Sequence, residues 1–150
     1  MKKLILLTVI GLCCSAIVRA QYQDVKEKKT EGNRPLAEFV KQQKVLWNFD
    51  WDFSFGKEQK EWRHVDLPHD FQFEQPWDRA GGLWARGFKA MGCGWYRRRL
   101  FADPAWRGKR VALDFGGILC ESEVYLNGEK MAEDDYGYLG FEVDVSNRLR

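Results

Sequence analysis

Two neighbouring residues, His69 and Asp70, are the first candidates for chemistry in this chain. They follow Pro68 in the stretch "HVDLPHDF", residues 64–71. A carboxylate held at the mouth of a loop can accept hydrogen bonds from the hydroxyl groups of a ligand. The same pair can serve the fold alone, because an Asp in a loop can accept backbone N–H bonds and fix a turn. On these residues alone, the turn-fixing interpretation is favoured over ligand contact.

Tryptophan side chains are the second set of candidates, because a flat indole face can stack on a sugar ring. Trp47 and Trp51 alternate in phase with neighbouring phenylalanines, so we expect them to pack in the core. Trp77 and Trp84 lie in a glycine-rich stretch outside any apolar period. For these two residues, ligand contact and a structural role are equally open.

The sequence contains no pattern that predicts a metal or cofactor site. Its two histidines, and the cysteines Cys93 and Cys120, lack the spacing of metal ligands. The stretch "GCGWYR" lacks the third glycine of a dinucleotide-binding loop and leads into a strand instead of a helix. A disulfide between Cys93 and Cys120 would be permitted outside the cytoplasm, but single buried thiols are also common.

The first 20 residues resemble a secretory signal peptide, with a basic start, a short apolar run, and Val18-Arg19-Ala20 before Gln21. We therefore expect export to the periplasm or the extracellular space, with cleavage after residue 20. The apolar run is short for a membrane span. A lipoprotein anchored at Cys13 or Cys14 ranks second, because the residues before those cysteines suit lipid attachment poorly.

Charge gives no indication of a nucleic-acid partner. Removing residues 1–20 takes three of the 24 basic residues and none of the 22 acidic ones, so the formal net charge becomes −1. Arg97, Arg98 and Arg99 are consecutive, but neighbours on a strand point to opposite faces and cannot form one basic patch.

Alternating apolar residues predict the elements that must position these side chains. Residues 21–44 are charged and predict a mobile leader, with at most a short helix around "LAEFVKQQ". From Val45 to Phe55 apolar residues alternate with polar ones, as in a strand with one buried face. Asn127-Gly128 predicts a tight hairpin. The long stretch from His69 to Gly94 predicts a loop. Strand character recurs over residues 62–67, 95–101, 110–117, 122–129 and 140–146.

Short strands at this spacing predict an all-β fold, an antiparallel sandwich. Within it, the order of five stretches resembles the N-terminal domain of the family 2 glycoside hydrolases, which are β-galactosidases, β-glucuronidases and β-mannosidases. The resemblance covers residues 45–150. The stretches are "LPHDF", "GCGWYRRRLF", "RVALDFGGI", "SEVYLNGE" and "YGYLGFEVDVS".

The resemblance implies a galactose-binding-like jelly roll that precedes an immunoglobulin-like domain and a catalytic barrel. It places the "LPHD" loop at the edge facing the barrel, which makes sugar contact by His69 and Asp70 as plausible as turn fixing. Both catalytic glutamates of the family lie on the barrel, so no catalytic residue is assigned here and the isolated chain is expected to be inactive. The sandwich is also expected to be incomplete at its C-terminus, with Phe141, Val143 and Val145 exposed.

Two functions follow as hypotheses from the sequence. The first is the front domain of an exported glycoside hydrolase acting on β-glycosides, with no cofactor, metal or nucleic acid involved. The alternative is a free-standing carbohydrate-binding module that uses Asp70, Trp77 and Trp84. The two differ in whether the reading frame continues beyond Arg150 into a barrel.

Overall fold

The computed structural model describes residues 4–11, 18–23, 42–80, 84, 87–89, 92–119 and 121–149. Nearly all regular structure in this part of the chain is β-strand, and every strand pair is antiparallel. The elements are β1 (Leu4–Gly11), β2 (Val18–Gln23), β3 (Gln42–Leu46), β4 (Trp51–Phe55), β5 (Arg63–Val65), α1 (Phe71–Glu74), β6 (Gly94–Phe101), a 3-10 helix (Pro104–Trp106), β7 (Arg110–Phe115), β8 (Ser122–Leu126), β9 (Glu129–Asp134) and β10 (Phe141–Asp144).

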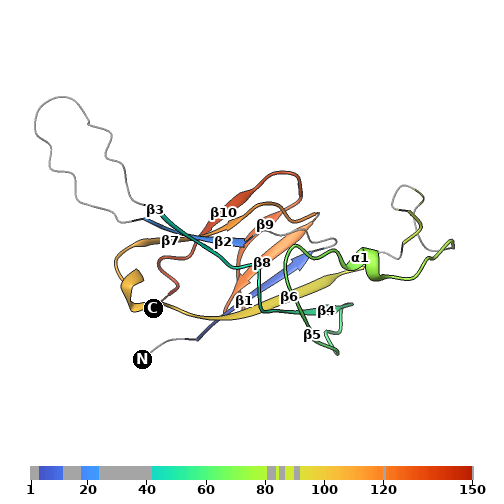
Figure 1. Ribbon diagram of the computed structural model, residues 1–150, viewed down its shortest axis with the longest axis horizontal. Helices are drawn as coiled ribbons and strands as arrows, with labels where there is room; N and C mark the ends of the chain where they lie inside the picture. The colour runs from blue at the N-terminus through green and yellow to red at the C-terminus, as the bar shows by residue number, and fades with distance from the viewer. Residues whose placement is uncertain are drawn as a thin grey trace, which may run out of the picture.

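The strands form two sheets that pack face to face as a sandwich (Figure 1). The six-stranded sheet has the order β5-β4-β6-β1-β8-β9, and the four-stranded sheet has the order β10-β7-β2-β3. Both sheets contribute to one apolar core: Trp51 and Tyr96 from the first sheet meet Leu113 and Phe115 from the second. The all-β sandwich expected from the sequence is therefore confirmed.

Most expected strands are present. The alternation in β7 is confirmed, because Val111, Leu113 and Phe115 are buried. The hairpin is confirmed as well: Asn127 and Gly128 both have positive φ, at 52° and 85°, and join β8 to β9. Positive φ at both central residues is the geometry that favours Asn-Gly in two-residue hairpins.

The prediction of one continuous strand from Val45 to Phe55 is wrong. The chain forms two strands of different sheets, β3 and β4, separated at Asp50, where φ is 61°. Trp51 and Phe53 are buried as expected, whereas Val45 and Phe49 are exposed. A left-handed residue ends the extended path and reverses which face the side chains occupy.

The N-terminal segments lie in the sheets. β1 pairs with β6 and β8, and β2 pairs with β7 and β3. The interpretation of residues 21–44 as an entirely mobile leader is therefore wrong at 21–23 and 42–44, which are strand. A short helix was also considered around "LAEFVKQQ". Its last two residues, Gln42 and Gln43, are strand, and its earlier residues lie outside the described part of the chain. Cleavage after residue 20 stays a prediction.

The C-terminal strand also differs from expectation. Val143 and Val145 are buried and Phe141 is partly buried, stacked on Phe115 at 4.9 Å between ring centroids. The prediction that Phe141, Val143 and Val145 form an exposed apolar face is therefore wrong. Among the helices that the structure describes, none is long and apolar enough to cross a membrane.

Candidate functional site

Asp70 begins the short helix α1 at one end of the six-stranded sheet. Its carboxylate oxygen Oδ1 accepts a hydrogen bond of 2.9 Å from the backbone N–H of Gln72. This contact satisfies an N–H that has no partner within the helix, which is the ordinary role of an N-cap residue. The turn-fixing role considered for Asp70 is therefore present in the structure.

The helix is held against the sheet by Phe71, which is fully buried. The Phe71 ring stacks on Phe53 at 5.6 Å and lies 5.4 Å from Phe55. Gly94, at the start of β6, makes this approach possible, because a Cβ atom there would lie 2.7 Å from the Phe71 ring. This packing of Phe71 fixes the position of α1 against the end of the six-stranded sheet.

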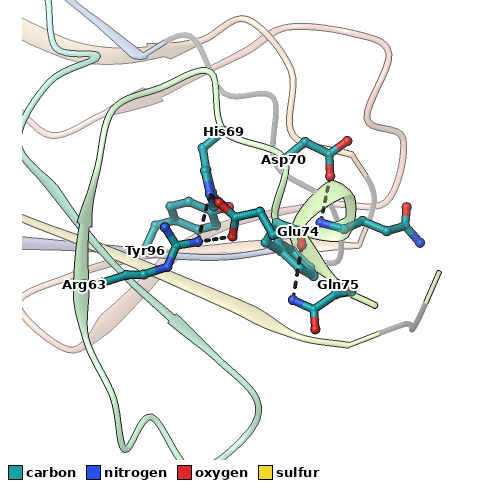
Figure 2. Close-up of polar contacts among 8 residues, drawn as sticks. Arg63, His69, Asp70, Glu74, Gln75 and Tyr96 are labelled. Atoms are coloured by element: carbon teal, nitrogen blue, oxygen red, sulfur yellow. Dashed lines mark hydrogen bonds and ion pairs between the residues drawn. The ribbon is translucent and has the colours of Figure 1, made fainter. Parts of the chain in front are cut away.

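His69 lies beside this helix at the centre of a polar cluster formed with Arg63, Glu74 and Tyr96 (Figure 2). The imidazole Nδ1 lies 2.8 Å from the Tyr96 hydroxyl. Its Nε2 lies 3.1 Å from Glu74 Oε1 and 3.2 Å from Arg63 Nη2. The ring also packs on Phe53, with the two ring centroids 4.8 Å apart. These contacts fix the orientation of the imidazole on every side.

Either neutral tautomer of His69 satisfies both ring nitrogens. If Nε2 carries the proton, it donates to Glu74 while Nδ1 accepts from the Tyr96 hydroxyl. If Nδ1 carries the proton, it donates to Tyr96 while Nε2 accepts from Arg63. The site can therefore hold the imidazole in place without a change of geometry as the proton moves between the two nitrogens.

Arg63 and Glu74 are the more accessible members of the cluster. Their side chains form an ion pair and are 48% and 43% exposed, whereas the His69 side chain is only 12% exposed. The Arg63 guanidinium also lies 5.0 Å from the centroid of the Phe53 ring. A ligand approaching this edge would meet the guanidinium of Arg63 and the carboxylate of Glu74 first. The less exposed His69 lies within hydrogen-bond distance of both.

Trp77 and Trp84 lie in the loop beyond α1 and are strongly exposed, at 73% and 80%. Trp77 forms a bridge with Lys89, whose Nζ lies 4.8 Å from the centroid of the indole ring. Lys89 Nζ also donates to the Gln75 carbonyl at 2.6 Å, which ties this part of the loop to α1. Trp84 makes a short turn closed by the N–H of Gly87 at 3.0 Å. Both indoles are therefore largely exposed to solvent, with Lys89 lying over one face of Trp77.

The structure brings the predicted residues His69 and Asp70 to the same edge as Trp77, and adds three partners that the sequence analysis did not identify: Arg63, Glu74 and Tyr96. These three come from β5, α1 and β6. A sequence signal was available only for Glu74, an acidic residue in the first turn after an N-cap Asp. The pairing of Arg63 and Tyr96 with His69 depends on the strand order β5-β4-β6.

Polar and aromatic side chains form much of the described part of this edge. In the part of the chain that the structure describes, no group of three or more His, Cys, Asp or Glu side chains could hold a metal ion. Cys93 has a free thiol whose pKa is raised by burial, so it is a weak nucleophile. Cys120, its possible disulfide partner, lies outside the described residues. Polar groups and exposed indoles at one rim suit the binding of a polyhydroxylated ligand.

A cavity of about 820 Å³ lies at the opposite end of β6, beyond Ala102. Its wall includes Trp106, Arg110 and Asp144. None of the residues proposed from the sequence lines it. Arg110 is already paired with Asp144 at 3.4 Å and with Glu142. The α1 edge, where the sequence-predicted residues gather, is therefore the candidate functional site.

Comparison with known proteins finds similar sequences among glycoside-cleaving enzymes. The chain is 33% identical over 119 residues to the β-galactosidase BoGH2A of Bacteroides ovatus, a match that covers 69% of this chain and 13% of that protein. It is 32% identical over 121 residues to a putative β-glucuronidase of Formosa agariphila, with 72% of this chain and 12% of that protein covered. A β-glucuronidase of Bacteroides fragilis is 30% identical over 112 residues, with 74% and 15% covered.

The chain is therefore homologous to one segment of proteins named as β-galactosidases and β-glucuronidases, and it spans between 12% and 15% of the length of these three relatives. No protein-family profile matches the chain. No solved structure is significantly similar to it.

Proposed function

We propose that the chain belongs to the family 2 glycoside hydrolases and forms their N-terminal, sugar-binding sandwich, a jelly roll of the galactose-binding type. The observation that carries this proposal is its similarity to named β-galactosidases and β-glucuronidases over about 70% of this chain but only 12–15% of each relative. An all-β sandwich agrees with such a domain. A segment of this size would be one domain of a much larger enzyme.

Within that enzyme, the α1 edge would border the sugar site of a catalytic barrel and the domain would dock against the barrel. Trp77 and Trp84 offer indole faces to a sugar ring, and the Arg63–Glu74 pair offers a hydrogen-bond donor and acceptor to its hydroxyl groups. His69 and Asp70 support this rim through the Tyr96 contact and the helix cap. The substrate would be a β-glycoside, and a β-galactoside is the first candidate.

The domain itself would perform no hydrolysis. Retaining glycosidases need a carboxylate nucleophile and a carboxylic acid about 5 Å apart, and the acid needs a raised pKa. Glu123 and Asp144 have the opposite property. Lys130 and Tyr125 lower the pKa of Glu123, and the Ser146 hydroxyl lowers that of Asp144. Both carboxyls therefore suit surface ion pairs better than proton donation to a leaving group.

Export would deliver the enzyme to the periplasm or the extracellular space, with mature protein starting at Gln21. The basic start, the apolar run and the small residue at position 20 support this step. N-terminal sequencing of protein secreted from a bacterial host tests it, since an acylated Cys13 or Cys14 would indicate a lipoprotein instead.

The reading frame beyond the codon for Arg150 tests the main proposal. A frame that continues into an immunoglobulin-like stretch and a barrel, and yields a protein that cleaves chromogenic β-galactosides or β-glucuronides, supports it. The 150-residue chain assayed alone should show no turnover, and clear turnover free of host enzyme would refute the proposal.

The exposure of Trp77 and Trp84 also favours a second function, a free-standing carbohydrate-binding module. A stop codon after Arg150 in every isolate, together with saturable sugar binding by the 150-residue chain, would favour that function. Tryptophan fluorescence during titration with galactose or glucuronate measures the binding directly.

A further inference from the structure

Lys89 and Trp77 stand opposite each other on two arms of the loop that joins α1 to β6. The two residues form an isolated antiparallel bridge. Beside this bridge, the backbone N–H of Asp78 donates to the Phe88 carbonyl at 2.7 Å. Residues that are directly opposite on paired segments project to the same side. The backbone therefore places the Lys89 ammonium over the Trp77 indole, with Nζ 4.8 Å from the ring centroid.

Main-chain carbonyl groups at the end of α1 hold the Lys89 ammonium in place. Its Nζ donates to the Gln75 carbonyl at 2.6 Å and to the Phe73 carbonyl at 3.3 Å. An ammonium has three N–H donors, so these two bonds leave one donor for a ligand. Because the two carbonyls and the indole already restrict this half-buried side chain, little of its rotamer freedom remains to be lost on binding.

The charge of Lys89 is not neutralised by a carboxylate. Within the described part of the chain, its polar contacts are the two carbonyls, which carry only partial charges. The Arg63 guanidinium at the same edge is different, because it forms an ion pair with Glu74. An anion that approached Arg63 would be repelled by the Glu74 carboxylate. Of these two cations, Lys89 is therefore the one that can pair with an anionic ligand.

The loop that carries Lys89 has an excess of positive charge. Residues 75–93, between α1 and β6, contain three basic residues and one acidic residue, Asp78, so their net charge is +2. Over residues 21–150 the formal net charge is −1. A local excess of one charge attracts ligands of the opposite sign over about a Debye length, ~8 Å at physiological salt. The charge of this loop therefore favours an anionic ligand.

We propose that Lys89 and Trp77 recognise an anionic pyranose, a sugar ring that carries a carboxylate or a sulfate ester. The ammonium pairs with the anionic group, and the exposed part of the indole packs against the apolar face of the ring. A lysine ammonium is a point charge without the fork geometry of arginine, so it accepts either anionic group. This inference rests on the proposed function, because it names the kind of sugar that the α1 edge takes.

The test uses the isotope-labelled 150-residue chain and two matched pairs of sugars. Methyl β-glucuronide is compared with methyl β-glucoside, and methyl β-galactoside sulfated on its exocyclic oxygen is compared with methyl β-galactoside. NMR titration follows the indole N–H signal of Trp77, which is assigned by its loss in Trp77→Phe. In at least one pair, the anionic sugar is expected to bind about three- to tenfold more tightly than the neutral one. Added salt should reduce this preference.

Three substitutions assign the preference to the charge of Lys89. Lys89→Met keeps an apolar stem but removes the charge, so it should abolish the preference while the neutral sugars bind as before. Lys89→Arg keeps the charge and should retain the preference. Lys44→Met is the matched control, because Lys44 is an exposed lysine on β3 of the other sheet, and it should change neither binding constant.

Equal binding of both members of each pair would overturn this proposal, and so would a preference that survives Lys89→Met. An equal loss of anionic and neutral binding in Lys89→Met would show that Lys89 only ties the loop to α1, which would also overturn it. Each of these outcomes leaves the proposed function standing. Absence of binding by all the sugars would overturn both this proposal and the sugar-binding role of the edge. A preference in one pair identifies the anionic group, and a preference in both shows that Lys89 responds to charge alone.

Discussion

Trp51 and Trp77 show how one residue type takes opposite roles in two regions of the molecule. Trp51 is fully buried in β4, and its indole N–H donates to the Trp47 carbonyl at 2.7 Å. Trp77 is 73% exposed beyond α1, and Lys89 Nζ lies 4.8 Å from the centroid of its ring. The first is in phase with the apolar period of its strand and the second belongs to no period. Periodicity therefore separates a tryptophan that packs in the core from one that lies on the surface.

Truncating the two tryptophans should break or confirm this contrast, and we expect the largest effect from Trp51. Trp51→Ala removes a fully buried indole and is expected to lower the free energy of unfolding by about 3–5 kcal/mol. Trp77→Ala should change it by less than about 0.5 kcal/mol. Urea denaturation of both variants of the 150-residue chain measures the difference. Similar losses in the two variants would mean that the loop around Trp77 is part of the core.

The two histidines provide a second matched pair. His69 packs on Phe53 and hydrogen-bonds to the hydroxyl of Tyr96, which is only 1% exposed, so His69→Ala removes both a ring contact and a hydrogen bond beside the core. A loss of about 1–3 kcal/mol is expected. His64 has a side chain that is 61% exposed, and His64→Ala should cost less than about 0.5 kcal/mol.

A double-mutant cycle sharpens the histidine comparison. In the Tyr96→Phe background the hydroxyl is absent, so His69→Ala should cost less than it does in the unaltered chain. Additive losses would show that the stabilisation by His69 comes from its packing on Phe53 and not from the hydrogen bond.

The same reasoning shows how far the sequence could predict this molecule. Alternating residues located β7, and Asn127-Gly128 located the β8–β9 turn, because both signals are local. The break at Asp50 could not be predicted, since Asp tolerates a left-handed conformation without requiring it. Helix α1 has four residues, too few to show a helical period.

The candidate site was predictable only in part. His69 and Asp70 were visible from the sequence because they are adjacent and follow Pro68. Arg63 and Tyr96 lie on separate strands and reach His69 through the strand order of the sheet. The register between distant strands depends on tertiary packing, which one sequence does not reveal. The exposed Arg63–Glu74 pair therefore became a candidate for ligand contact only from the structure.

Two capping aspartates offer a smaller contrast. Asp70 caps α1, which buries Phe71, and Asp103 caps the 3-10 helix Pro104–Trp106, which contains no buried residue. Asp70→Ala should cost about 1 kcal/mol, whereas Asp103→Ala should cost less because less packing depends on its turn. The Asp70→Asn variant keeps the capping oxygen, so it should retain the stability of the unaltered chain in the same denaturation experiment.

Asp144, on the surface of β10, should give the smallest effect. The Ser146 hydroxyl and backbone N–H, at 2.6 Å and 2.9 Å, lower the pKa of its carboxyl, and Arg110 adds to this effect. A pKa that is lower in the folded state contributes stability above the unfolded pKa of about 3.9. That contribution is lost as the pH falls through the folded pKa. The side chain is 52% exposed, so the contribution should stay below about 0.5 kcal/mol.

Salt and a single substitution separate the two causes of this shift. Salt screens the Arg110 charge but leaves the short hydrogen bonds from Ser146 in place. In 1 M salt (~3 Å screening length), the Asp144 pKa followed by NMR should therefore remain below that of a free carboxyl. Ser146→Ala removes the hydroxyl donor and should raise the Asp144 pKa toward the ordinary value more than salt does. A larger rise in salt than in Ser146→Ala would show that the charge of the adjacent Arg110, and not the hydrogen bonds from Ser146, dominates the shift of the Asp144 pKa.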